Sequence, residues 1–240
     1  MNLRQITAFV CVLVWIQPLA ADAQNSQPNA LYLNGSRGYV TLPGYLTRGL
    51  TEATVEAWVR WESFNTWSRV FDFGQENNAA VLQNEKDKST LYFAIYNRQG
   101  KRNRIKSKYR ATQGEWIHLA AIVSKTLGLQ LYVNGHLAAQ MKSSTTLDDI
   151  GGGNNFIGKS NWPDDGLFHG YLAELRIWKK VRSPQEIQTH MSTQLTAEEV
   201  GLLGYWRFDR ANGNGISDLT GNGFDATLMD GAELQPVSGL

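Results

Sequence analysis

The sequence predicts an all-β protein, an antiparallel jelly-roll β-sandwich with one or two short helices near its C-terminal third. Short runs in which apolar and polar residues alternate recur along the chain, separated by clusters of Gly, Asn, Asp and Ser. This pattern is typical of sandwiches and jelly rolls. Helix signals are confined to two short segments after residue 182. Since 240 residues are within the range of one large β domain, we expect a single domain over residues 24–240.

The strands are expected where the alternating runs lie. The pair Asn134-Gly135 follows one such run and predicts a two-residue hairpin turn, because both residues tolerate a positive φ. We expect the last residues, 234–240, to be a frayed end. The expected strands are 30–33, 39–42, 54–61, 68–74, 79–83, 91–96, 104–109, 116–124, 129–133, 136–141, 155–158, 170–178, 204–208 and 226–228.

Two capping patterns predict the helices. Ser183 can cap a helix, Pro184 suits the first helical position, and Glu186 can reach back to the backbone N–H of the cap. A short helix is therefore expected directly after Ser183. Thr196-Ala-Glu-Glu repeats the capping pattern, so a second short helix is expected near Thr196.

The first 23 residues have the features of a secretory signal. An apolar run over residues 6–16 is followed by Ala21-Asp-Ala, a small-x-small cleavage site, before Gln24. The run is too short to span a bilayer. We therefore expect the mature protein to be secreted or periplasmic, with no membrane span. The only cysteine, Cys11, lies in the leader, so stability has to come from an apolar core and not from disulfides.

Three motifs carry a resemblance to a known family. They are Trp116-Ile-His-Leu-Ala, Leu131-Tyr-Val-Asn-Gly, and Gly170-Tyr-Leu-Ala-Glu-Leu-Arg-Ile-Trp followed by Ser183-Pro-Gln-Glu-Ile. In this order they resemble the laminin-G-like members of the concanavalin A-like lectin/glucanase superfamily. The resemblance implies a jelly-roll sandwich, and laminin-G-like domains as a class bind sulfated or uronic-acid polysaccharides.

The resemblance also raises the question of calcium. Many relatives hold a structural Ca²⁺ with an Asp near the first strand and an Asp in the motif that begins here at Gly170. Those positions are Asn34 and Ala173 in this chain. Asn34 remains a candidate Ca²⁺ ligand, but Ala173 offers no side-chain oxygen, and a hard cation needs several. We therefore expect no cofactor, and we interpret the oxygen-rich segment 218–225 as an Asx turn.

The sequence argues against catalysis. Glycosidases of this superfamily place two carboxylates on one face of a strand, whereas Glu115 and Glu174 each stand alone on a strand. The segment 91–100 superficially resembles a strand of jelly-roll alginate lyases, but the other lyase motifs are missing. No Gly-x-Ser-x-Gly elbow is present. A polysaccharide hydrolase or lyase with an unrecognised site stays open as an alternative.

The most unusual local composition is a basic segment in an otherwise nearly neutral chain of net charge +1. If it is extended, alternate residues share one face. This basic ribbon is either the charged protection of an edge strand or a binding patch for an anionic polysaccharide. Its members are Arg102, Arg104, Lys106, Lys108 and Arg110.

Two tryptophans lie in polar loops. Trp67 lies in the segment 64–68, and Trp162 lies in the segment 160–166 beside Asn161 and Asp164. An exposed Trp in such a loop is costly without a ligand, although a loop Trp can also fold back to close the end of the sandwich. We therefore take these four residues as a second candidate ligand site.

The sequence as a whole favours an exported, non-catalytic recognition domain. Its expected partner is a carbohydrate, such as an anionic polysaccharide, or an extracellular protein, and not nucleic acid, because export separates the chain from it. The third alternative is a structural or adhesion module of a surface assembly. The sequence does not determine the oligomeric state.

Overall fold

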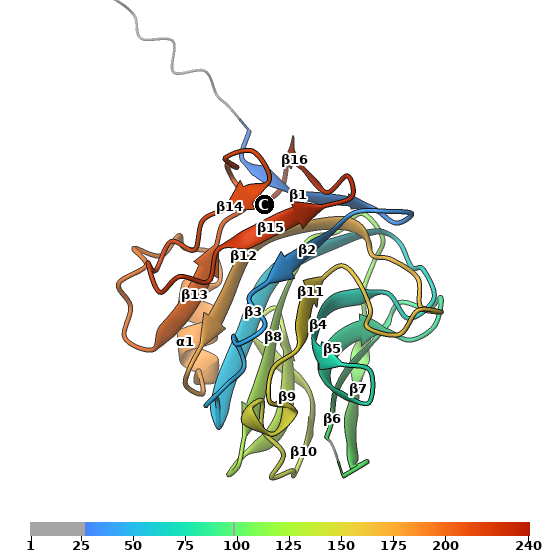
Figure 1. Ribbon diagram of the computed structural model, residues 1–240, viewed down its shortest axis with the longest axis vertical. Helices are drawn as coiled ribbons and strands as arrows, with labels where there is room; N and C mark the ends of the chain where they lie inside the picture. Colours follow the sequence, from blue (N-terminus) through green and yellow to red (C-terminus); the bar gives the residue numbers. More distant parts are fainter. Residues whose placement is uncertain (1–26, 98) are drawn as a thin grey trace, which may run out of the picture.

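The structure, a computed structural model, describes residues 27–97 and 99–240. The expected signal segment 1–23 lies outside these residues. Two antiparallel sheets pack face to face (Figure 1), which confirms the predicted all-β sandwich.

The two sheets are called A and B. In spatial order, sheet A contains β10 (His136–Met141), β9 (Gly128–Val133), β8 (Ile117–Ser124), β3 (Glu52–Ser63), β12 (His169–Trp178), β1 (Asn29–Asn34) and β16 (Glu233–Pro236), with β13 (Leu202–Trp206) paired to β12. Sheet B contains β14 (Gly215–Ile216), β15 (Ala226–Met229), β2 (Tyr39–Leu42), β11 (Asn154–Ile157), β4 (Arg69–Gln75), β5 (Asn78–Asn84), β6 (Thr90–Tyr96) and β7 (Arg102–Arg110).

The core lies between the sheets and is built by the alternation that the sequence shows. Leu33 in β1, Phe73 in β4 and Phe93 in β6 are fully buried in one apolar cluster. Their sequence neighbours point to the outer faces, since successive residues of a strand alternate. Each expected strand overlaps an observed one. The predicted Asn134-Gly135 turn is also confirmed, with φ values of 49° and 76°.

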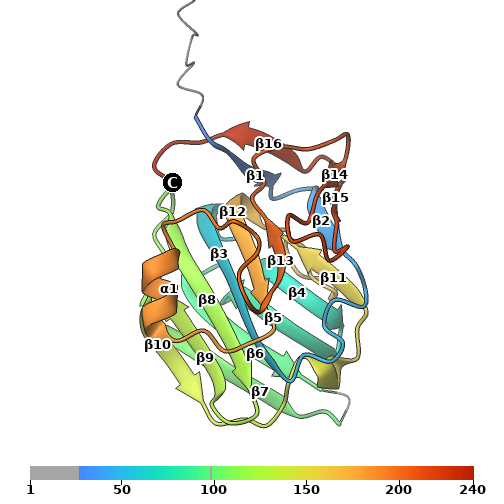
Figure 2. The same cartoon turned by 90° about the vertical axis from the view of Figure 1, so that its left-hand side faces the viewer.

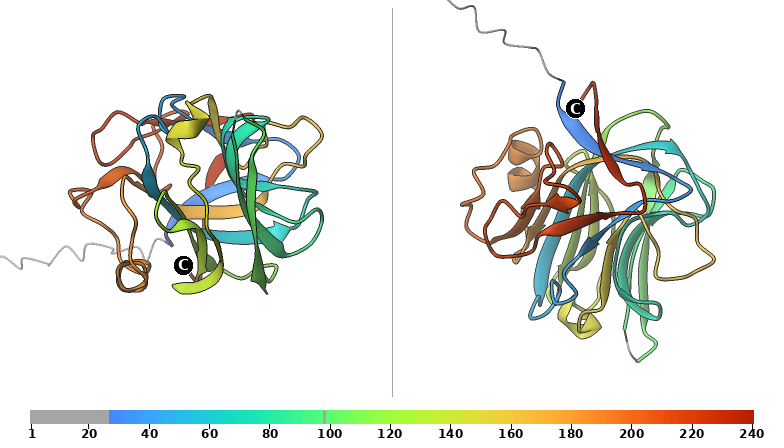
Figure 3. Two further views of the ribbon diagram at one scale, coloured as in Figure 1. Left: turned by 90° about the horizontal axis from the view of Figure 1, so that it is seen from below. Right: turned by 45° about the horizontal axis from the view of Figure 1, so that its top comes forward.

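The helix α1 (Pro184–His190) begins where the capping pattern predicts. Ser183 Oγ accepts a hydrogen bond from the Glu186 N–H, and the Glu186 side chain accepts one from the Ser183 N–H. Ile187 anchors the helix on the outer face of sheet A, where it packs with residues of β8 and β9 (Figure 2). Figure 3 shows α1 and the β6–β7 hairpin on opposite sides of the molecule. In the described residues, no helix is long and apolar enough to cross a membrane.

Two sequence predictions are wrong. The segment at Thr196 is not a helix: the Thr196 N–H and hydroxyl do donate to Glu199 Oε1, but Ala197 has a left-handed φ of 72°, and β13 starts at Leu202. The end of the chain is not frayed, because β16 pairs with β1. A 3₁₀ turn, η1 (Asp148–Ile150), was not anticipated.

Candidate functional site

The candidate site lies on the outer face of sheet B, where the loop between β11 and β12 folds over β4, β5 and β6. A buried ion-pair network holds this loop. Arg69 Nε donates to Asp72 Oδ2 at 3.1 Å, and Arg69 Nη2 donates to Asp165 Oδ2 at 2.6 Å. The Asp72 carboxylate also accepts the Asn161 backbone N–H at 3.1 Å and the Asn161 amide at 2.9 Å. Burial raises the pKa of Asp72, and the contacts with Arg69 and Asn161 act in the opposite direction.

This network holds Trp162 against the outer face of sheet B. Its backbone N–H donates to Ser160 Oγ at 3.0 Å, and that hydroxyl in turn donates to Asp165. The half-buried indole packs against a small apolar cluster of β5 and β6, edge-on to Tyr96 at 5.7 Å between ring centroids. The Arg69 guanidinium lies 5.3 Å from the indole centroid. Trp162 therefore lies on the outer face of sheet B and does not close the end of the sandwich.

Trp67 approaches the same face from the loop between β3 and β4. Its backbone has a left-handed φ of 55°, which is unfavourable for a residue with a Cβ. Two hydrogen bonds hold it there, from the Trp67 N–H to Lys86 O at 2.9 Å and from Arg69 Nη1 to Trp67 O at 2.7 Å. The half-buried ring lies 6.1 Å from that of Tyr92.

The basic ribbon forms β7, the last strand of sheet B. Its five cations are all exposed, and the residues between them point inward. The ribbon is not uniform. Lys106 forms an ion pair with Glu85 at 2.8 Å, and their hydrogen bond raises the pKa of Lys106 and lowers that of Glu85. Lys108 and Arg110 follow at a register shift in the pairing with β6.

The first two cations of the ribbon meet the two loop tryptophans in one cavity of about 230 Å³. Arg102 pairs across the ladder with Tyr96, and Arg104 pairs with Ala94. The Arg104 guanidinium lies 5.0 Å from the Tyr92 ring centroid. We call this space the aromatic–basic cavity; its lining residues are Trp67, Arg69, Asn77, Gln83, Tyr96, Arg102, Arg104, Trp162 and Asp165.

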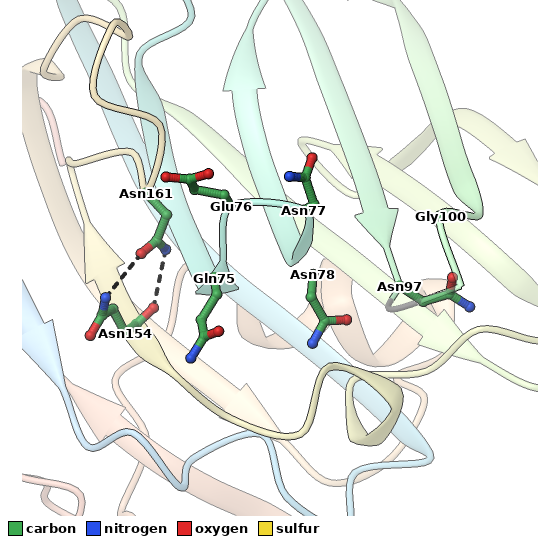
Figure 4. Close-up of a pocket in the computed structure, with 8 residues that line it drawn as sticks. All are labelled: Gln75, Glu76, Asn77, Asn78, Asn97, Gly100, Asn154 and Asn161. Atoms are coloured by element: carbon green, nitrogen blue, oxygen red, sulfur yellow. Dashed lines mark hydrogen bonds between the residues drawn. The ribbon is translucent and has the colours of Figure 1, made fainter.

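A second space of about 510 Å³ adjoins it. Figure 4 shows the β4–β5 turn between the Asn154–Asn161 pair on one side and Asn97 with Gly100 on the other. Asn77 lines both spaces. We call the second space the amide hollow; its lining residues are Gln75, Glu76, Asn77, Asn78, Asn97, Gly100, Asn154 and Asn161.

The other predicted site residues have different positions. Asn161 is a positioning residue that binds Asp72 and borders the amide hollow. Asp164 is exposed on the loop and lines neither space. Sequence reasoning missed Arg69 and Asp165, which anchor the loop. It also missed Tyr96, although the period-two alternation of β6 could have placed Tyr96 on the outer face.

The positions considered for calcium have ordinary structural contacts. Asn34 Oδ1 accepts hydrogen bonds from the Ser36 N–H at 3.1 Å and the Arg37 N–H at 3.0 Å, which is an Asx turn. Ala173 is buried in a small cluster on sheet A. Asp218 accepts hydrogen bonds from Thr220 and from backbone N–H groups. Within residues 27–97 and 99–240, no group of three or more His, Cys, Asp or Glu residues is placed to hold a metal ion.

The carboxylates that line the two spaces do not lie in the same one. Asp165 lines the aromatic–basic cavity and is paired with Arg69, whereas Glu76 lines the amide hollow. Glu174, which the sequence analysis considered for catalysis, lies in the other sheet. It binds Arg176 at 2.8 Å and accepts the Tyr205 hydroxyl. The arrangement in the aromatic–basic cavity is thus suited to binding a ligand that has a flat apolar face and a negative group.

Residues 34–188 match a family model described as the concanavalin A-like lectin/glucanases superfamily. The chain belongs to this superfamily. The match agrees with the resemblance that the strand motifs carry. A search of curated protein sequences found no match.

Solved structures with this fold include several carbohydrate-related proteins. A candidate carbohydrate binding protein from Bacteroides ovatus has a TM-score of 0.70 and 21% identity, over 89% of this chain and 61% of that one. This chain thus spans less than two thirds of its length. A carbohydrate-binding module of a Ruminococcus gnavus sialidase, solved with α2,3 sialyllactose, has a TM-score of 0.57 and 15% identity over 68% and 97%.

A third relative in fold is domain 4 of an extracellular arabinanase from Geobacillus stearothermophilus, solved with arabinotriose. It has a TM-score of 0.53 and 23% identity, over 67% of this chain and 75% of that one. At these identities the likeness is one of fold.

Proposed function

We propose that this protein is an exported, non-catalytic module that binds acidic carbohydrate in the aromatic–basic cavity on the outer face of sheet B. One observation carries the proposal. Trp67 and Trp162, from two separate loops, meet Arg102 and Arg104, from an edge strand, around one cavity. Solved modules of the same fold that bind sialyllactose or arabinotriose support carbohydrate as the ligand class.

The chemistry of the cavity favours a sugar with a negative group. Indole faces pack against the apolar face of a sugar ring, while an Arg guanidinium binds a carboxylate or sulfate through paired hydrogen bonds. The charge of Arg69 is balanced by Asp72 and Asp165. Among the described residues, no ion pair involves Arg102 or Arg104. The positive potential of the cavity therefore comes from these two side chains.

The backbone at Trp67 supports the same interpretation. Residues held in rare conformations concentrate at functional sites, where the surrounding structure compensates their cost. Trp67 is such a residue, and the Arg69 network that holds it also holds Trp162. One buried cation thus positions both aromatic rings of the cavity.

A glycan array probed with residues 24–240 tests this function. We expect retention of acidic glycans, strong loss with Trp162→Ala, and no loss with Trp116→Ala, which removes another half-buried Trp on the outer face of sheet A. Because Ala173 lacks a ligand oxygen, a chelator is expected to change neither binding nor melting temperature. Equal binding by both variants would place the site elsewhere.

Because we propose that the protein is exported, we expect the mature chain to begin near Gln24. Measurement of its intact mass by mass spectrometry tests this.

A further inference from the structure

The aromatic–basic cavity and the amide hollow are neighbours, and their adjacency defines the ligand further. Asn77, in the β4–β5 turn, lines both the aromatic–basic cavity and the amide hollow. In the loop between β11 and β12, two consecutive residues border different spaces. Trp162 borders the cavity, and Asn161 borders the hollow. A ligand longer than one sugar can therefore contact residues of both spaces, on either side of Asn77.

The two spaces differ in charge. The aromatic–basic cavity contains two arginines without an acidic partner among the described residues. Six of the eight described residues that line the amide hollow are Asn or Gln, and the ionisable one among them is Glu76. Amide groups both donate and accept, as sugar hydroxyls do. The hollow is thus suited to a neutral, hydroxyl-rich unit, and Glu76 repels a second negative one.

Several amides of the hollow are fixed before any ligand arrives. The Asn154 and Asn161 side chains are joined by a hydrogen bond of 3.3 Å, drawn in Figure 4, and Asn161 is also bound to Asp72. On the other side, Asn97 Oδ1 accepts the Lys101 N–H at 2.9 Å. Side chains that are already ordered lose little entropy when they bind. Several polar groups of the hollow are therefore already ordered before a ligand binds.

We propose that the preferred ligand is an oligosaccharide in which a neutral unit directly follows an acidic one, and that Glu76 disfavours chains made only of acidic units. The inference rests on the proposed function, because the acidic unit occupies the aromatic–basic cavity. Selection by repulsion of the wrong partner is a common source of specificity. Here the repelling group is one exposed carboxylate at the tip of the β4–β5 turn.

Calorimetric titration of the mature protein with eight-unit chains tests the inference. Three probes alternate acidic and neutral sugars (hyaluronan, chondroitin and heparosan), and three contain only uronate (polygalacturonate, polymannuronate and polyguluronate). We expect the best alternating chain to bind about tenfold more tightly than the best homouronate, a difference of about 1.4 kcal/mol. Glu76→Gln is expected to reduce this preference about threefold or more by improving homouronate binding, while the matched exposed control Glu198→Gln leaves it unchanged.

A second comparison removes the amides. Replacing Gln75 and Asn154, which line only the amide hollow, together by Ala is expected to weaken the best alternating chain about threefold to tenfold, the range for one lost hydrogen bond. The same change should leave binding of single glucuronate unaltered, and the exposed loop control Asn214→Ala should change neither.

The outcomes separate the two proposals. Equal affinity for both classes, with binding still dependent on Arg102 and Arg104, would overturn the inference and leave the proposed function standing. A preference for homouronates would have the same consequence. If none of the six chains and no single uronate binds, the proposed function fails and the inference fails with it.

Discussion

At the scale of single residues, the site depends on side chains whose positions other residues fix. Trp67 keeps a left-handed backbone because Lys86 and Arg69 bind its peptide groups. Trp162 keeps its place because Asp165 and Ser160 tie its loop to Arg69. The sequence identified both tryptophans but not these anchors, since nothing local distinguishes Arg69 or Asp165 from surface charges.

Trp67 provides a test at this scale, because the effects of its backbone conformation and of its ring can be measured separately. Glycine accepts a positive φ without strain, whereas the same conformation costs a residue with Cβ about 1 to 2 kcal/mol. We therefore expect Trp67→Gly to be more stable than Trp67→Ala by about 1 kcal/mol in urea unfolding, although both variants lose carbohydrate binding. If Trp67→Ala proves the more stable of the two, the left-handed conformation is not a constraint of the fold.

At the scale of elements, the alternation of apolar residues was sufficient to find fourteen of the sixteen strands of the described residues. The sequence analysis did not predict β14 and β16, which are short and have a single buried residue between them. The helix after Ser183 was predictable from its capping residues. The segment at Thr196 makes similar capping contacts through Glu199, but Ala197 has a left-handed φ of 72°, so the backbone does not continue as a helix, and β13 begins at Leu202. Tertiary pairing of β13 with β12 therefore prevails over the local signal.

The capping box of α1 gives a prediction with a pH dependence. Burial opposes ionisation of Glu186, but hydrogen bonds from the Ser183 N–H and from Lys180 lower its pKa to about 2. Because this pKa lies below the value of 4.5 for an unperturbed Glu, the ionised side chain stabilises the fold above about pH 4.5, and the stabilisation is lost as the pH falls towards 2.

We therefore expect Glu186→Ala to lower the free energy of unfolding by about 1 kcal/mol at pH 7. The difference from the parent protein should shrink steadily between about pH 4.5 and pH 2 in urea titrations. Glu198→Ala, which removes an exposed Glu outside the helix, serves as the control and should show no such trend. A difference for Glu186→Ala that does not vary with pH would contradict the role of its charge.

The strand β7 provides a comparison within one element. Arg102 and Arg104 line the aromatic–basic cavity, whereas Lys108 and Arg110 are exposed outside it. Replacing the first pair by Ser should abolish most binding of an acidic oligosaccharide and flatten its salt dependence, since ionic contacts weaken as salt screens them. Replacing the second pair should weaken binding only slightly. Equal losses in calorimetric titrations would mean that the ribbon acts as a diffuse charged surface and not through the cavity.

At the scale of the whole molecule, the sequence predicted the architecture but not the way in which its candidate residues meet. The two tryptophans and the basic ribbon were separate hypotheses, because Trp67 and Trp162 lie far apart along the chain. Their meeting depends on the order of strands in sheet B, in which β11 pairs with β4 and brings its following loop over β5 and β6. Alternation within a strand does not determine that order.

The most direct test of the central claim is a crystal structure of residues 24–240 with a bound acidic oligosaccharide. The account predicts a sugar ring between Trp67 and Trp162, with its negative group within hydrogen-bond distance of Arg102 or Arg104. The next unit should extend past Asn77 into the amide hollow. A ligand bound on the outer face of sheet A, or at the turn of Asn34, would contradict the account.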